Sequence, residues 1–71
     1  MLGETYIINK EYSKGARIES FEKCTRNGKL VIIINNEIFG EYTNESERDK
    51  AFNKIVESIS ASLACIDLSK L

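Results

Sequence analysis

Basic and aromatic side chains that could bind an anion are concentrated between positions 10 and 29. They are Tyr12, Lys14, Arg17, Lys23 and Arg26. Cationic groups pair with phosphates, and an aromatic ring can stack on a nucleotide base. The segment is therefore a candidate site for an anionic nucleotide or for single-stranded nucleic acid. The alternative is that Tyr12 serves packing, as a single surface tyrosine more often does.

The distribution of charge allows two interpretations of this segment. Residues 10–29 carry six basic and three acidic side chains, whereas residues 37–57 carry three basic and six acidic ones. The two segments can attract each other weakly across the surface, or the first can bind an external anion. The whole chain has a formal net charge of −1, which gives no general case for nucleic-acid binding.

Few residues in this sequence suit catalysis. Histidine, the commonest general base, does not occur. Cys24 follows Lys23 and lies near Arg26, and these charges would favour a reactive thiolate, but no partner base accompanies the thiol. Cys65 is far from Cys24 in the sequence, and the two have no metal-ligand spacing. We therefore expect no enzyme activity.

Metal and cofactor binding are not expected either. Glu45, Glu47 and Asp49 could bind a hard cation, but acidic residues in this position more often stabilise the N-terminus of a helix. The four glycines are isolated and form no phosphate-binding loop.

The spacing of apolar and turn residues predicts a small single α+β domain. Asn-Gly at 27–28 and Asn-Asn at 35–36 are turn sequences that connect sequential antiparallel strands. Ile18 and Phe21 fall on opposite faces of an extended chain, so the second strand is expected to begin after Ile18 or to contain a bulge. The expected elements are a three- to four-stranded meander, with strands at 4–9, 17–25, 29–35 and 37–42, and one helix at 44–69.

The expected helix carries two apolar stripes. Asn44 and Glu47 fit a capping box at its start. The stripe expected to pack on the sheet contains Phe52, Ile55, Val56, Ile59, Leu63 and Ile66. The second stripe lies on the opposite side, beyond the end of the strands, and contains Ala61, Ala64, Cys65 and Leu68; Leu71 is expected to join it in the same interface. Because one chain cannot cover both stripes, we predict that the second is the interface of a homodimer or larger closed oligomer.

The apolar run LVIII at 30–34 also bears on assembly. It does not alternate apolar and polar residues, so both faces of this strand are expected to be covered. We expect the helix on one face and a partner subunit on the other. The alternative is a strand that exposes a few apolar side chains.

A further set of residues carries a family resemblance: FGEYT at 39–43, YIINK at 6–10, and Glu47, Arg48, Ala51, Ile55 and Ile59. In this pattern the chain resembles short proteins of Gram-positive bacteria and their phages, in which a strand leads into a capped helix. The resemblance implies a β-meander followed by a helix, and no activity. The segment after Ile59 departs from the pattern. Small phage proteins of this kind often inhibit host enzymes or defence systems.

The leading expectation is a non-catalytic interaction protein of the phage type, which inhibits a host enzyme or defence system by binding it as a homo-oligomer. The alternatives are an oligomer that binds an anionic nucleotide through residues 10–29, and a nucleic-acid accessory protein. The N-terminus has no apolar run of signal-peptide length, and the run at 30–34 is too short to span a membrane. We therefore expect a cytoplasmic protein with reduced cysteines and no membrane association.

Overall fold

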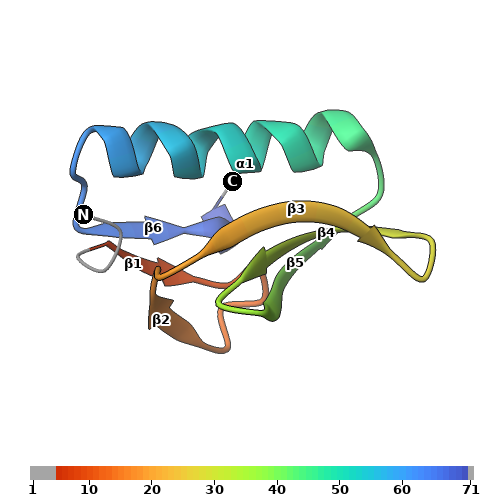
Figure 1. Cartoon of the computed structure of the whole chain (residues 1–71), viewed down its shortest axis with the longest axis horizontal. Helices are drawn as coiled ribbons and strands as arrows, with labels where there is room; N and C mark the ends of the chain where they lie inside the picture. The colour runs from red at the N-terminus through yellow and green to blue at the C-terminus, as the bar shows by residue number, and fades with distance from the viewer. Residues whose placement is uncertain (1–4, 71) are drawn as a thin grey trace.

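One long helix covers two small three-stranded sheets, which confirms the predicted α+β class (Figure 1). The computed structural model describes residues 5–70. Its elements in chain order are β1 (Tyr6–Ile8), β2 (Gly15–Arg17), β3 (Phe21–Arg26), β4 (Lys29–Ile34), β5 (Glu37–Tyr42), α1 (Glu45–Ser60), β6 (Cys65–Asp67) and the 3₁₀ helix η2 (Leu68–Lys70). One sheet has the strand order β2-β1-β6 and the other the order β3-β4-β5.

The second sheet is the antiparallel meander that the two turn sequences predict. Asn27 and Gly28 have φ angles of 51° and 78°, and Asn35 and Asn36 have φ angles of 51° and 69°. Glycine and asparagine adopt positive φ more readily than other residues, so the chain reverses at both points. β4 is therefore the central strand, with β3 and β5 on either side.

β5 contains a bulge that determines which of its side chains face the helix. Ile32 lies opposite Gly40 but Ile33 lies opposite Ile38, so Phe39 is the extra residue. Phe39 is only 3% exposed and belongs to the core. Beyond the bulge, Gly40 and the residue two positions later share one face of the strand.

The strand predicted at 17–25 is interrupted: its first residue belongs to β2, and the part from Phe21 onward belongs to β3. β2 pairs with β1, and β3 begins at Phe21, as the opposite parity of Ile18 and Phe21 indicated. The Asn35 side chain holds the break between them. Its Oδ1 accepts from the N–H groups of residues 19–20 at 2.8 and 3.0 Å, and its Nδ2 donates to the Arg17 carbonyl at 2.7 Å.

α1 begins as predicted but ends at Ser60, well before the expected end at 69. The Asn44 side chain accepts the N–H of Glu47 at 2.8 Å and caps the first turn. At the other end Ser62 has a φ of 57°, a left-handed conformation that terminates a helix. The prediction of one long helix with two apolar stripes is therefore wrong.

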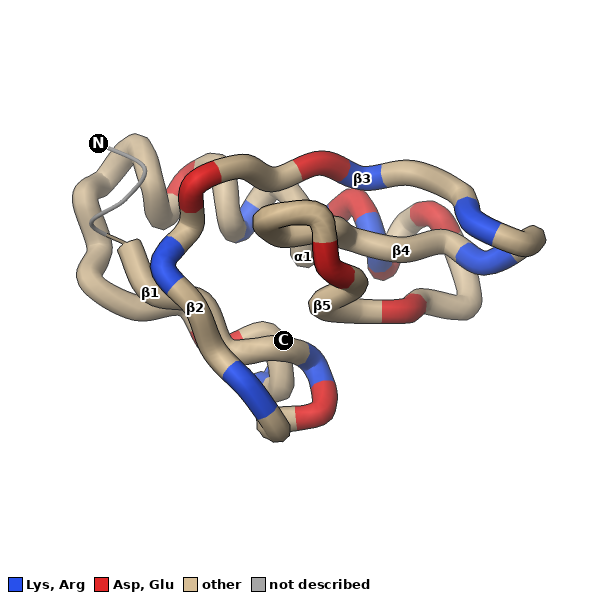
Figure 2. The backbone as a smooth tube through the Cα atoms, turned by 60° about the horizontal axis from the view of Figure 1, so that its bottom comes forward, with Lys and Arg blue, Asp and Glu red and all other residues tan. Residues whose placement is uncertain are grey.

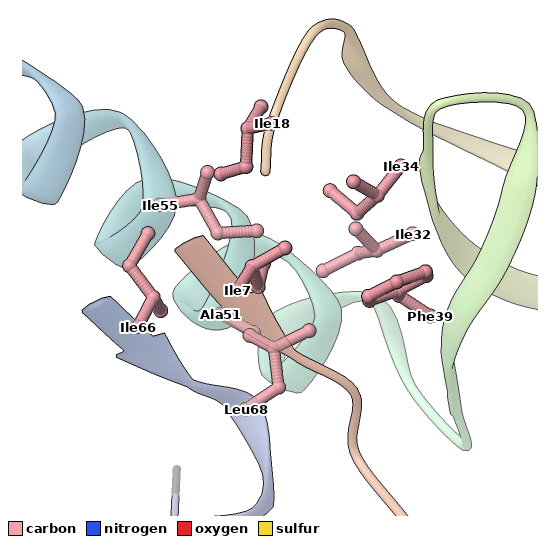
Figure 3. Packing of buried hydrophobic residues seen from close by; sticks show 9 residues of the cluster. All are labelled: Ile7, Ile18, Ile32, Ile34, Phe39, Ala51, Ile55, Ile66 and Leu68. Carbon is pink, nitrogen blue, oxygen red and sulfur yellow. The ribbon is translucent and has the colours of Figure 1, made fainter. Parts of the chain in front are cut away.

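The segment after α1 forms β6, which pairs in parallel with β1 and places Ile66 opposite Ile7. Ile66 and Leu68 are two residues apart and both point into the core, where they are 4% and 1% exposed (Figure 3). Leu68 is therefore a core residue of its own chain, and its prediction as an interface residue is wrong. The two-residue spacing of Ile66 and Leu68 is typical of a strand, but the prediction assigned both residues to a helix.

The other predicted interface residues have no common helical face. Ala61, Ala64 and Cys65 are exposed, in the turn after α1 and at the start of β6. Their place in an interface stays a prediction, although the argument from a continuous helix no longer supports it. Leu71 lies outside the described residues.

The core is formed between α1 and both sheets (Figure 3). Ile55 is fully buried in it, and Ile59 packs against it, as expected for the first stripe. Val56, by contrast, is 41% exposed. The buried cluster contains Ile7, Ile18, Ile32, Ile34, Phe39, Ala51, Ile55, Ile66 and Leu68.

The second face of β4 is covered without a partner subunit. Val31 and Ile33 point away from the helix and are nevertheless 0% and 2% exposed. The strand register places Cys24 and Glu41 on either side of Val31, on the same face. The unalternated run at 30–34 is therefore explained within one chain, and it is not evidence for an oligomer.

Candidate functional site

A groove of about 530 Å³ runs between α1 and the outer edge of β5. Five of its lining residues come from the helix at spacings of three and four, which place them on one helix face. We call it the Tyr42 groove; it is lined by Lys10, Tyr42, Glu47, Lys50, Ala51, Lys54 and Glu57.

The ring of Tyr42 is held in a fixed position within this groove. It lies over Gly40, where an added Cβ would be 2.9 Å from the ring Cε1. The Lys10 ammonium lies 4.1 Å from the ring centroid, a cation–π contact. Glycine at position 40 is thus required for the ring to pack this closely on its own strand.

Lys10 is itself fixed by the edge of β5. Its main-chain N–H donates to the Phe39 carbonyl at 2.8 Å, and its Nζ donates to the Glu41 carbonyl at 2.6 Å. These two bonds join the end of β1 to β5, so residues far apart in the sequence meet at one groove. They also satisfy two carbonyl groups at the β5 edge.

The Tyr42 hydroxyl is buried, and no other group within residues 5–70 donates a hydrogen bond to it or accepts one from it. Burial, and secondarily the negative charge of Glu47, raise its pKa above the ordinary value of 10.0. The hydroxyl is therefore neutral at physiological pH. Because it is inaccessible from outside, the hydroxyl stays unpaired, at a cost in stability.

The rim of the Tyr42 groove alternates in charge. Lys50 and Lys54 are exposed on α1, and Glu47 and Glu57 flank them. The aliphatic stems of the lysines add apolar surface next to Ala51 and the tyrosine ring. This is a surface with a partly apolar floor and a polar rim of mixed charge.

The structure does not bring together the five residues of the predicted anion site. Tyr12 is 66% exposed at the turn between β1 and β2, and Lys14 pairs there with Glu37. Lys23 faces the helix, and Arg26 flanks the β3–β4 turn. Figure 2 shows the basic positions near β2 and those at the β3–β4 turn at opposite ends of the molecule.

The two segments of opposite charge instead pair with each other. Three ion pairs connect residues 10–29 with residues 37–57. Their side chains are 37–64% exposed, so each pair contributes at most about 1 kcal/mol. These contacts correspond to the interpretation in which the two segments attract each other weakly across the surface. The pairs are Lys14–Glu37, Lys23–Asp49 and Lys29–Glu41.

The acidic residues at the start of α1 have structural partners. Asp49 accepts from Lys23 at 3.0 Å, and this hydrogen bond lowers the pKa of Asp49 below its ordinary value. Arg48 is buried and donates to the Cys24 carbonyl of β3 at 3.1 Å, which ties the helix to that strand. Within residues 5–70, no group of three His, Cys, Asp or Glu side chains is arranged to hold a metal ion.

Sequence reasoning missed the Tyr42 groove. The helical spacing of Lys50, Ala51 and Lys54 was visible and could have marked one face of α1. The position of Lys10 beside Tyr42 was not visible in the sequence, because it depends on hydrogen bonds between the end of β1 and β5 that no local pattern indicates.

Comparison of the chain with protein-family models finds no match, and comparisons with curated proteins and with solved structures find none either. No helix within residues 5–70 combines the length and the apolar character needed to cross a membrane.

Proposed function

We propose that this chain is a non-catalytic interaction protein that binds a partner protein through the Tyr42 groove. The fixed tyrosine ring carries this proposal. Tyrosine is enriched among the residues that dominate binding energy, since its large ring loses little conformational freedom on binding. Here Gly40 and Lys10 already hold the ring in place before a partner arrives.

The rim residues indicate the chemistry of the partner. Three lysines and two glutamates line the groove, so an apolar side chain flanked mainly by acidic groups would fit it best. The resemblance of residues 39–43 to short phage proteins favours a host protein as the partner. On this proposal the chain inhibits a host enzyme or defence system by occupying one of its surfaces.

The experiment compares variants of the intact chain as baits in a lysate of a Gram-positive host. Lys50→Glu combined with Lys54→Glu reverses two rim charges at exposed positions and should abolish capture of the partner. Arg17→Glu is the control, because it reverses an exposed charge of the basic segment at a position that does not line the groove. Capture that survives the double change but not Arg17→Glu would move the site to residues 10–29.

A captured protein then has to bind directly. The purified partner should bind the wild-type chain and lose at least tenfold in affinity for the double variant, while circular dichroism shows the fold unchanged. Equal affinity for both chains would reject the Tyr42 groove as the binding site.

A second candidate function is the binding of an anionic nucleotide in the same groove. It is favoured by one observation: three lysines and a tyrosine ring line the same groove. A nucleoside triphosphate and a single-stranded oligonucleotide, each titrated at 50 mM and 300 mM salt, are suitable probes. Phosphate binding should weaken steeply with salt, whereas an interface with an apolar centre should not.

A further inference from the structure

The free edge of β3 is the longest unprotected strand edge among the described residues. The β3–β4 turn has positive φ at both central residues, so Arg26 and Lys29, which flank it, form a hydrogen-bonded pair. Such pairs alternate along an antiparallel ladder. The main-chain N–H and C=O groups of Lys23 and Thr25 therefore point away from β4.

Nothing else in residues 5–70 bonds to those outward main-chain groups of Lys23 and Thr25. β3 forms the upper rim of its sheet in Figure 2, with no other segment beyond it. The opposite edge differs, because Lys10 bonds to two carbonyls of β5. An open edge of six residues is a template for another strand.

We propose that a second copy of this chain pairs with β3 in antiparallel fashion, about a two-fold axis at Cys24. The two sheets would then join into one of six strands. In this register Lys23 lies opposite Thr25 of the other copy, and their outward main-chain groups bond to each other. Glu22 lies opposite Arg26 of the other copy, and Cys24 opposite the second Cys24.

Charge complementarity fixes this register. Glu22 and Arg26 are both exposed, and neither forms an ion pair within residues 5–70. They share the face of β3 away from the helix, but four residues of strand separate them by about 13 Å, too far to pair with each other. Under the two-fold axis Glu22 of each copy lies opposite Arg26 of the other copy, so the dimer contains two such ion pairs.

The two helices have room in this arrangement. α1 contacts all three strands of the meander and so lies approximately over β4. The two copies of β4 would be three strand spacings apart, about 14 Å. Packed helices need about 8–10 Å between their axes. The remaining gap accommodates helix side chains between the two axes.

Light scattering on a charge-reversal series tests the proposal. The wild-type chain at micromolar concentration should have twice the 8.1 kDa mass of one chain. Glu22→Arg alone and Arg26→Glu alone each place like charges opposite each other, and each should give the mass of one chain. An equimolar mixture of the two should restore the double mass, because each mismatch becomes a match. The proposal would be overturned if the wild type had the mass of one chain. It would also be overturned if both single variants kept the mass of a dimer.

A main-chain variant separates edge pairing from charge. Thr25→Pro removes an outward N–H without touching the bonds to β4 and should give monomers, whereas Thr25→Val retains the N–H and should stay dimeric. Circular dichroism checks that both fold. If the wild type is monomeric but Thr25→Pro abolishes capture of a host protein, the occupant of the edge is a different chain and the proposal of a second copy fails.

A short bismaleimide cross-linker tests the register. In a Cys65→Ser background the two Cys24 thiols should be joined into a covalent dimer. With Cys24→Ser, which leaves Cys65, no covalent dimer should form. The reverse result would place the contact at the segment after α1. Since the Tyr42 groove and the β3 edge lie on opposite sides of α1, these variants leave the proposed partner site intact.

Discussion

The ring of Tyr42 lies so close to Gly40 that an added Cβ would be 3.0 Å from the phenolic oxygen. The two residues share one face of β5 beyond the bulge at Phe39. The glycine therefore serves a close approach of a side chain to its own strand. It also determines where the aromatic part of the groove lies.

Gly40→Ala should displace the Tyr42 ring. The clash is with a side chain that can swing outward, so we expect a loss of about 1 kcal/mol in the free energy of unfolding, at the low end for overpacking. The double variant Gly40→Ala with Tyr42→Ser should lose less than the sum of the two single losses. Urea unfolding measures all three, and strict additivity would show that the two residues do not interact.

Tyr42→Phe should leave the fold intact and raise the free energy of unfolding by up to about 1 kcal/mol at pH 7, because a buried hydroxyl without a partner is removed. The wild type should also lose stability as pH rises above 10. Burial raises the pKa of Tyr42 in the folded chain, so the unfolded chain releases this proton first and is favoured at high pH. Tyr42→Phe should lack this part of the loss in the free energy of unfolding. An identical loss in both proteins between pH 9 and 11 would contradict the prediction.

Leu68→Ala should cost about 2–5 kcal/mol, because the side chain is 1% exposed in the core. In a chain this small such a loss can unfold the protein outright. Leu63→Ala is the matched control, since Leu63 is 48% exposed and should change stability by less than about 1 kcal/mol. Thermal unfolding of the two variants side by side decides; equal melting temperatures would show that Leu68 is not in the core.

Tyr12→Asn should stabilise the protein by about 0.5–1 kcal/mol. Tyr12 has a φ of 55°, a left-handed conformation that asparagine tolerates better than an aromatic residue. Its ring is 66% exposed, so little packing is lost. A lower midpoint in urea than that of the wild type would mean that the ring makes a contact that outweighs the backbone strain.

The sequence predicted the parts of the fold that depend on neighbouring residues. Asparagine and glycine at 27–28 and asparagine at 35–36 mark both reversals of the meander, and Asn44 marks the start of α1. Each of these signals acts within four residues, through a backbone angle or one hydrogen bond. Local chemistry alone was sufficient there.

The end of α1 could not be identified in the same way. No glycine or proline follows Ser60, and Ala61, Ala64, Cys65 and Leu68 happen to continue a helical repeat. What ends the helix is the pairing of β6 with β1 and the burial of Leu68, which depend on residues at the other end of the sequence. The only local sign was the two-residue spacing of Ile66 and Leu68.

The candidate site was mislocated for a related reason. Lys14 and Lys23 looked free in the sequence, but Glu37 and Asp49 neutralise them across the fold. Tyr42 and Lys10 carried no motif, and only the joining of β1 to β5 makes them neighbours. Composition could indicate which side chains are able to bind anions, but not which of them lie close together in the fold.

The parallel pairing of β1 with β6 also determines when this protein can finish folding during its synthesis. The β3–β5 meander and α1 can form as they leave the ribosome, because their contacts are local. β1 emerges first but must wait for residues 65–67 before its parallel partner exists. Until then Ile7 lacks Ile66 as a neighbour, and one side of the core stays open to chaperones and proteases. The 56 residues between β1 and β6 are therefore translated before β1 gains its parallel partner.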